Sequence, residues 1–80
     1  MVNQSLKYSL NNHKVITIMY MKDLEIIQRR IQVLKMEGAL IKALDIDKGQ
    51  LRTFKIDRIL SAIDTKLMNN ADIMAENYIS

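Results

Sequence analysis

The pattern of apolar and polar positions predicts a series of short strands in the middle of the chain. The segment from Val15 to Met21 is dense in β-branched and aromatic side chains and too short for an independent helix, which favours a buried strand. From Glu25 to Leu34 apolar and polar positions alternate, the period of a strand with one solvated face. The second segment also has apolar side chains at helical spacing, and no proline interrupts the chain, so an all-helical protein is the alternative.

Turn signals divide the region that follows. Met36 to Gly38 is typical of a hairpin connection that leads into a strand over Ala39 to Ile46. The clearest turn is Asp47 to Gly49, because its glycine supplies the positive φ that a three-residue hairpin loop commonly needs. The next strand spans Gln50 to Ile56. These segments predict antiparallel strands joined by tight turns.

Helical segments are expected at both ends of this β-rich centre. A short helix is predicted over Gln4 to Leu10, and Asn70 is suited to cap a second helix near the C-terminus. Asp57 is expected to cap a single helical turn before a closing edge strand over Ile59 to Ile63. The predicted organisation is an N-terminal helix and turn over residues 1–13, a barrel over residues 14–64 and a helical tail over residues 65–80.

The strand pattern predicts the fold class. Roughly four or five short strands joined by tight turns are typical of a small barrel. We therefore expect a mainly β fold, a half-open barrel of the Sm or SH3 type with short N- and C-terminal helices. Eighty residues form one modest core and leave little room for a deep catalytic cleft, so we expect a non-enzymatic protein.

Composition excludes several kinds of site. The chain has no cysteine and a single histidine, His13, so it offers neither a disulfide framework nor a zinc site. It also lacks a glycine-rich phosphate loop. We therefore expect no metal and no cofactor. A chain without cysteine suits the reducing cytoplasm, and no run approaches the roughly 18 apolar residues of a membrane helix, so no membrane contact is expected.

The charge distribution favours an anionic partner. Twelve Lys and Arg against nine Asp and Glu give a net charge of +3. Between Lys14 and Ile63 there are ten basic and six acidic side chains, a net charge of +4, so the positive charge is concentrated on the predicted barrel.

The central segments also resemble a known family. The run Arg52 to Ile59 is similar to the arginine, phenylalanine, aspartate, arginine and isoleucine signature that ends WYL domains, Sm-like β-barrel modules found mostly in bacterial transcription regulators. Lys14 to Tyr20 resembles the first strand of that family, and Arg29 to Val33 resembles its arginine-bearing second strand. Where the family has tryptophan, tyrosine and leucine, this chain has Ala39, Leu40 and Ile41. The resemblance implies a divergent, stand-alone WYL-like domain of bacterial or phage type.

The resemblance also implies a ligand site in which the motif arginines line the binding surface. A guanidinium group offers fixed donors that match a phosphate group bidentately, and an aromatic ring can stack on a base. We predict that nucleic acid or a nucleotide binds in a regulatory role, through Tyr20, Arg29, Arg30, Arg52 and Arg58. The alternative for Arg58 is a structural ion pair with Asp57 or Asp45.

Adjacent positions in a strand point to opposite faces, so only one of Arg29 and Arg30 can join Arg52 on its face. Phe54 is expected in the core.

The second hypothesis for function is a small structural or interaction protein that docks onto a partner protein through its edge strand and C-terminal helix. Because 49% of so short a chain is hydrophobic, we also expect a homodimer. Its interface is expected at Leu60 and Ile63 or at Met74 and Tyr78.

Overall fold

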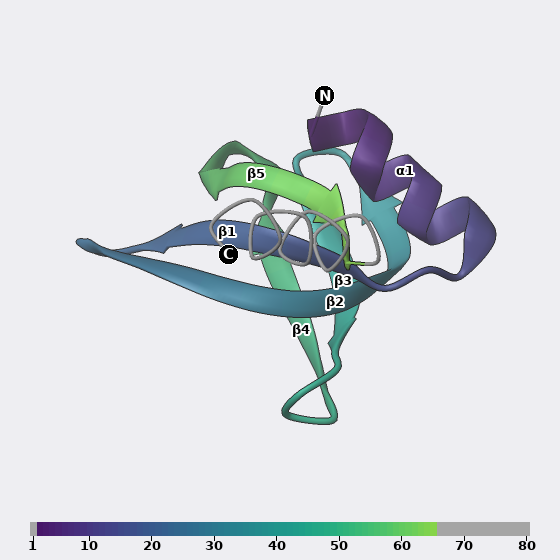
Figure 1. Cartoon of the computed structure of the whole chain (residues 1–80). Helices are drawn as coiled ribbons and strands as arrows, with labels where there is room; N and C mark the ends of the chain where they lie inside the picture. The colour runs from purple at the N-terminus through teal and green to yellow at the C-terminus, as the bar shows by residue number, and fades with distance from the viewer. Residues whose placement is uncertain (1, 66–80) are drawn as a thin grey trace, which may run out of the picture.

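The computed structural model describes residues 2–65, which form one antiparallel sheet with a helix packed beside it (Figure 1). The elements in chain order are α1 (Val2–Asn12), β1 (Ile16–Lys22), β2 (Glu25–Glu37), β3 (Leu40–Asp45), β4 (Gln50–Lys55), the short 3₁₀ helix η1 (Ile56–Arg58) and β5 (Ile59–Asp64). The expected mainly β fold is confirmed, and the all-helical alternative is wrong. The helix predicted near Asn70 lies outside the described residues.

The sheet bends because β2 changes its partner halfway along its length. The strand order is β4-β3-β2-β1-β5. The first half of β2 pairs with β1, and the second half pairs with β3. Ile31 marks the change, since it lies opposite both Ile16 and Asp45. A register shift between Val33 and Lys35 bends the strand further, and the sheet becomes a half-open barrel with β4 and β5 at its edges.

The concave face of the sheet holds the core. Buried and exposed side chains alternate along β4, because Phe54 is buried while Leu51 and Thr53 are exposed. Along β2, Ile31 is buried and its neighbour Arg30 is exposed. The buried apolar cluster contains Leu6, Ile16, Ile18, Ile31, Val33, Ile41, Ala43, Phe54, Ile59 and Ala62.

Helix α1 packs on the sheet through apolar side chains and one buried polar side chain. Leu6 is fully buried in the core. Ser9 is also fully buried, and its hydroxyl accepts a hydrogen bond from the Val33 amide at 2.9 Å and donates one to the Lys14 carbonyl at 2.6 Å. The helix predicted over Gln4 to Leu10 is confirmed and is longer at both ends. No helix within residues 2–65 has the length and apolar character that spanning a bilayer requires.

The hairpin turns follow the expected glycines. Gly49 adopts φ +63° in the turn between β3 and β4, so the predicted left-handed position is confirmed. The connection predicted at Met36 to Gly38 begins later, because β2 continues through Glu37 and the turn itself is Gly38 and Ala39. Gly38 provides the positive φ there, at +55°.

The helical turn before β5 is present, but the prediction that Asp57 caps it is wrong. The N-cap position of η1 is Lys55, and no side chain makes a capping hydrogen bond there. Lys55 keeps the extended conformation of β4, so the turn begins two residues earlier than the sequence indicated and Asp57 lies within it. The edge strand predicted over Ile59 to Ile63 is confirmed as β5.

Candidate ligand-binding site

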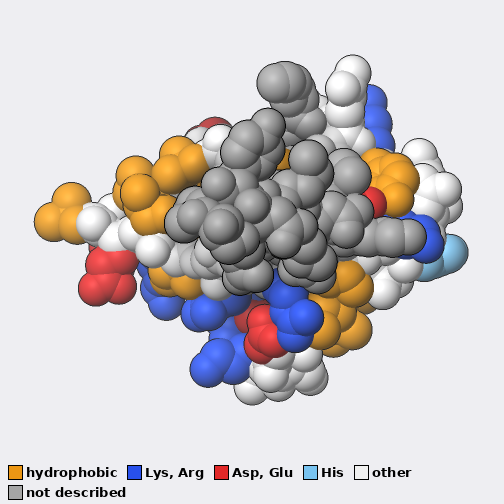
Figure 2. Space-filling view, in the orientation of Figure 1, with side chains coloured by type: hydrophobic (Ala, Val, Ile, Leu, Met, Phe, Trp, Pro, Cys, Tyr) orange, Lys and Arg blue, Asp and Glu red, His pale blue; other side chains and the backbone are white. Residues whose placement is uncertain are grey.

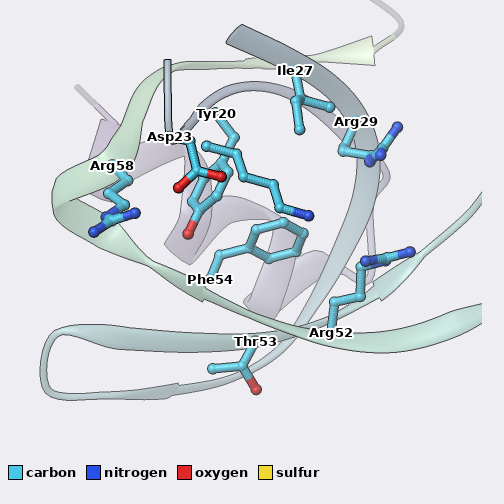
Figure 3. Close-up of a pocket in the computed structure, with 9 residues that line it drawn as sticks. Tyr20, Asp23, Ile27, Arg29, Arg52, Thr53, Phe54 and Arg58 are labelled. Carbon is cyan, nitrogen blue, oxygen red and sulfur yellow. The ribbon is translucent and has the colours of Figure 1, made fainter. Parts of the chain in front are cut away.

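A pocket of about 400 Å³ lies between β1, β2, β4 and η1 (Figure 3). Its lining includes four cationic side chains and a single acidic one, Asp23; the cations are Lys22, Arg29, Arg52 and Arg58. The bend of β2 makes this arrangement possible, because it brings β4 across the sheet toward the end of β1. The excess of positive charge makes the pocket attractive to anions.

One side of the pocket is built on a buried carboxylate. The Asp45 side chain is fully buried, and its Oδ2 lies 3.0 Å from Arg52 Nε and 3.6 Å from Arg29 Nε. The two arginine side chains are 30% and 36% exposed, so they reach from this carboxylate to solvent. Figure 3 shows Arg29 and Arg52 together on the same side of the pocket. The carboxylate thus holds two neighbouring guanidinium groups at one place.

An aromatic pair forms the middle of the pocket. The rings of Tyr20 on β1 and Phe54 on β4 meet edge to face, with centroids 5.0 Å apart and planes at 76°. Phe54 is buried, which confirms its expected place in the core, whereas Tyr20 is half-buried and lines the pocket. The Lys55 amide donates a long hydrogen bond of 3.5 Å to the Tyr20 hydroxyl. Tyr20 therefore joins β1 to β4 across the barrel opening.

Arg58 lies on the other side of the pocket from Arg29 and Arg52, with the aromatic pair between them (Figure 3). It belongs to η1 and is exposed. Within residues 2–65 it forms no ion pair, and the alternative pairing with Asp57 or Asp45 is not seen: Asp45 contacts Arg29 and Arg52 instead. The Arg58 guanidinium is thus available to a ligand.

Arg30 is separated from the other predicted site residues. It lies on the outer face of β2, where its Nε–H donates to both carboxylate oxygens of Asp47, at 3.2 and 3.3 Å. Hydrogen bonding and charge attraction in this pair raise the pKa of Arg30 and lower the pKa of Asp47. Arg30 does not line the pocket. Lys and Arg side chains still gather on the lower part of the face in Figure 2, near β2 and β4.

A solved structure shows a similar fold. A segment of proteasome accessory factor B/C (PafBC) of Arthrobacter aurescens matches this chain with a TM-score of 0.67 and 17% sequence identity. The match covers 78% of the residues of this chain. This chain spans 11% of the length of the PafBC chain. At this identity the likeness shows a shared fold. No model of a known protein family matches the sequence, and no curated protein matches it.

The structure thus places Tyr20, Arg29, Arg52 and Arg58 around one pocket and Arg30 outside it. Sequence reasoning named Asp45 as a possible partner of Arg58 and missed its contacts with Arg29 and Arg52, because an aspartate beside a hairpin is ordinary turn chemistry. The sequence around Asp45, four residues before Gly49, indicates a turn and gives no sign of a binding role. Within residues 2–65 no cluster of three acidic or histidine side chains is arranged to hold a metal ion.

Proposed function

We propose that this chain is a non-enzymatic binding module that holds an anionic ligand, a nucleic acid or a nucleotide, in the pocket between β1, β2, β4 and η1. The observation that carries the proposal is the convergence of Tyr20, Arg29, Arg52 and Arg58, from four separate elements, on one pocket. Guanidinium groups on both sides suit phosphate oxygens, and the Tyr20 ring between them suits a base.

A role in bacterial transcription regulation is supported by two further observations. The run from Arg52 to Ile59 resembles the closing signature of WYL domains. A segment of PafBC shares the fold of this chain, which agrees with the small barrel that the resemblance implies. In this role the module senses a ligand.

Binding to single-stranded nucleic acid tests the proposal. Fluorescence anisotropy with a labelled oligonucleotide is expected to show weak binding that decreases steeply between roughly 50 and 200 mM salt, because arginine–phosphate contacts release counterions. Arg58→Gln should weaken binding, since Arg58 lines the pocket. Arg30→Gln is the matched control: it removes the same charge from β2 outside the pocket and should retain most of the affinity. Absence of binding at high micromolar protein in low salt would overturn the nucleic-acid proposal.

The second candidate function is docking onto a partner protein. It is favoured by β5, an edge strand with half-exposed Leu60 and Ile63. An edge strand offers backbone groups to an added strand, and these side chains offer apolar contact. Salt-insensitive binding to a protein partner, lost in Leu60→Glu, is the result expected for this function.

A further inference from the structure

Asp45 occupies an unusual position for a carboxylate. Its side chain is fully buried, and ionised groups are costly to bury without compensation. One oxygen, Oδ1, accepts a hydrogen bond of 3.2 Å from the Lys48 amide in the β3–β4 turn. The other, Oδ2, faces the Nε atoms of Arg29 and Arg52. Asp45 therefore connects the β3–β4 turn to both arginines.

The contact with Arg52 is electrostatic. Asp45 Oδ2 and Arg52 Nε are 3.0 Å apart, yet neither buried atom completes a hydrogen bond in the described structure. In both guanidinium groups the Nε atom lies beside Asp45 Oδ2, and Figure 3 shows Arg29 and Arg52 on the same side of the pocket. The terminal nitrogens of a guanidinium carry four of its five donor hydrogens, so most of the donors are left for a ligand.

We propose that Asp45 is the positioning and specificity-determining residue of this pocket: it orients Arg29 and Arg52 and reduces the charge on that side from +2 to +1. This inference rests on the proposed function and names its ligand class, the phosphodiester monoanion. A phosphodiester carries one negative charge, whereas a terminal phosphate carries nearly two above its second pKa of about 6. Asp45 lies behind the arginines and repels the second charge of a terminal phosphate.

The orientation of the arginines can be measured without a ligand. In the ¹⁵N-labelled chain, the Nε–H proton of Arg52 should exchange with water more slowly than that of Arg58, because Arg52 Nε is buried against Asp45 whereas Arg58 is exposed. Equal exchange rates for the two arginines would overturn the positioning role. This measurement uses the unaltered chain, so it decides the point even where an Asp45 variant does not fold.

The charge preference is tested with two ligands that differ by a methyl group. Thymidine 5′-monophosphate and its methyl ester are titrated into the ¹⁵N-labelled chain at about pH 8, where the first is dianionic and the second monoanionic. Asp45→Asn should shift the ratio of the two dissociation constants toward the dianion by about tenfold, because one repelling charge is removed. Asp47→Asn is the matched control. It removes the same charge two residues away, from a carboxylate paired with Arg30 outside the pocket, and should leave the ratio unchanged.

The outcomes separate this inference from the proposed function. If the unaltered chain binds the labelled oligonucleotide and both thymidine compounds, but Asp45→Asn and Asp47→Asn give the same ratio, the role of Asp45 in specificity is wrong and the proposed function stands. If the unaltered chain binds neither the oligonucleotide nor either compound, the proposed function fails, and the specificity role fails with it.

Discussion

Arg29 and Arg30 are neighbours in the sequence, and each faces an aspartate from the end of β3 or the turn after it. Arg29 lies beside the buried Asp45, whereas Arg30 binds Asp47 in solvent. The two pairs therefore have different roles. The Arg29–Asp45 pair shapes the pocket, whereas the Arg30–Asp47 pair is a surface contact that water and salt weaken.

Arg58 provides the first residue-scale prediction. Arg58→Ala should weaken oligonucleotide binding and leave the melting temperature nearly unchanged, because Arg58 is exposed and has no ion pair within residues 2–65. Arg52→Ala should instead cost about 1–3 kcal/mol of stability, because buried Asp45 loses its nearer partner and keeps Arg29. Thermal unfolding and anisotropy measure both effects. A large loss of stability in Arg58→Ala with affinity retained would show that Arg58 is structural.

The Arg30–Asp47 pair predicts a pH effect. The pKa of Asp47 is lowered because its carboxylate accepts hydrogen bonds from Arg30. A group with a lowered folded-state pKa contributes stability above its unfolded pKa and loses that contribution as the pH falls through the folded value. Carboxyl ¹³C titration should therefore give Asp47 a pKa below the usual value for aspartate, about 3.9. Arg30→Gln should return it toward that value, and an unchanged pKa would contradict the assignment.

At the scale of elements, a buried serine of α1 makes a hydrogen bond to the backbone of β2. The register shift between Val33 and Lys35 interrupts the regular pairing of β2 with β3. Beside it, the buried Ser9 hydroxyl accepts a hydrogen bond from the Val33 amide. The same hydroxyl donates to the Lys14 carbonyl, in the segment between α1 and β1. Both backbone groups would lack these bonds without it.

Ser9→Ala should therefore destabilise the chain by about 1–3 kcal/mol, the cost of leaving buried polar groups unsatisfied. Chemical denaturation measures the change in the free energy of unfolding. Ser61→Ala on β5 is the matched control, because Ser61 is exposed and such substitutions usually change stability by less than about 0.5 kcal/mol. Equal effects of the two substitutions would remove Ser9 from this role.

At the scale of the whole molecule, the described residues leave several large apolar side chains exposed. They occur on both edge strands, with Leu51 on β4 and Leu60 and Ile63 on β5. The tip of the β1–β2 hairpin adds Leu24, which is 99% exposed. Small domains are commonly supported by association, so this surface favours a second copy of the chain.

We predict a homodimer that uses the β5 edge. Sedimentation equilibrium of the full chain should show a dimer at micromolar concentration, and Leu60→Glu should shift it toward the monomer by placing a charge in the interface. Leu51→Glu, the same change on the opposite edge strand, should leave the dimer intact. A full-length chain that stays monomeric at high micromolar concentration rules the dimer out.

The sequence by itself determined the strands, the β3–β4 turn and the arginine-bearing faces, whereas the β2–β3 turn and the start of η1 differ from the prediction. Alternation fixes which side chains share a face, so Phe54 in the core and Arg29 and Arg30 on opposite faces followed from local order. The positive φ of the β3–β4 turn followed from the glycine at position 49. These features depend on interactions between residues that are adjacent in the sequence, so the sequence pattern is enough to predict them.

Tertiary structure alone decided which arginines meet. The change of partner along β2 at Ile31 brings β4 toward the end of β1, and this places Arg29, Arg52 and Arg58 around one pocket. It also buries Asp45 between two arginines, although a turn aspartate would ordinarily be exposed. Sheet curvature and the burial of a charge depend on contacts between residues far apart in the chain. The periodicity of apolar and polar positions along the chain does not predict those contacts.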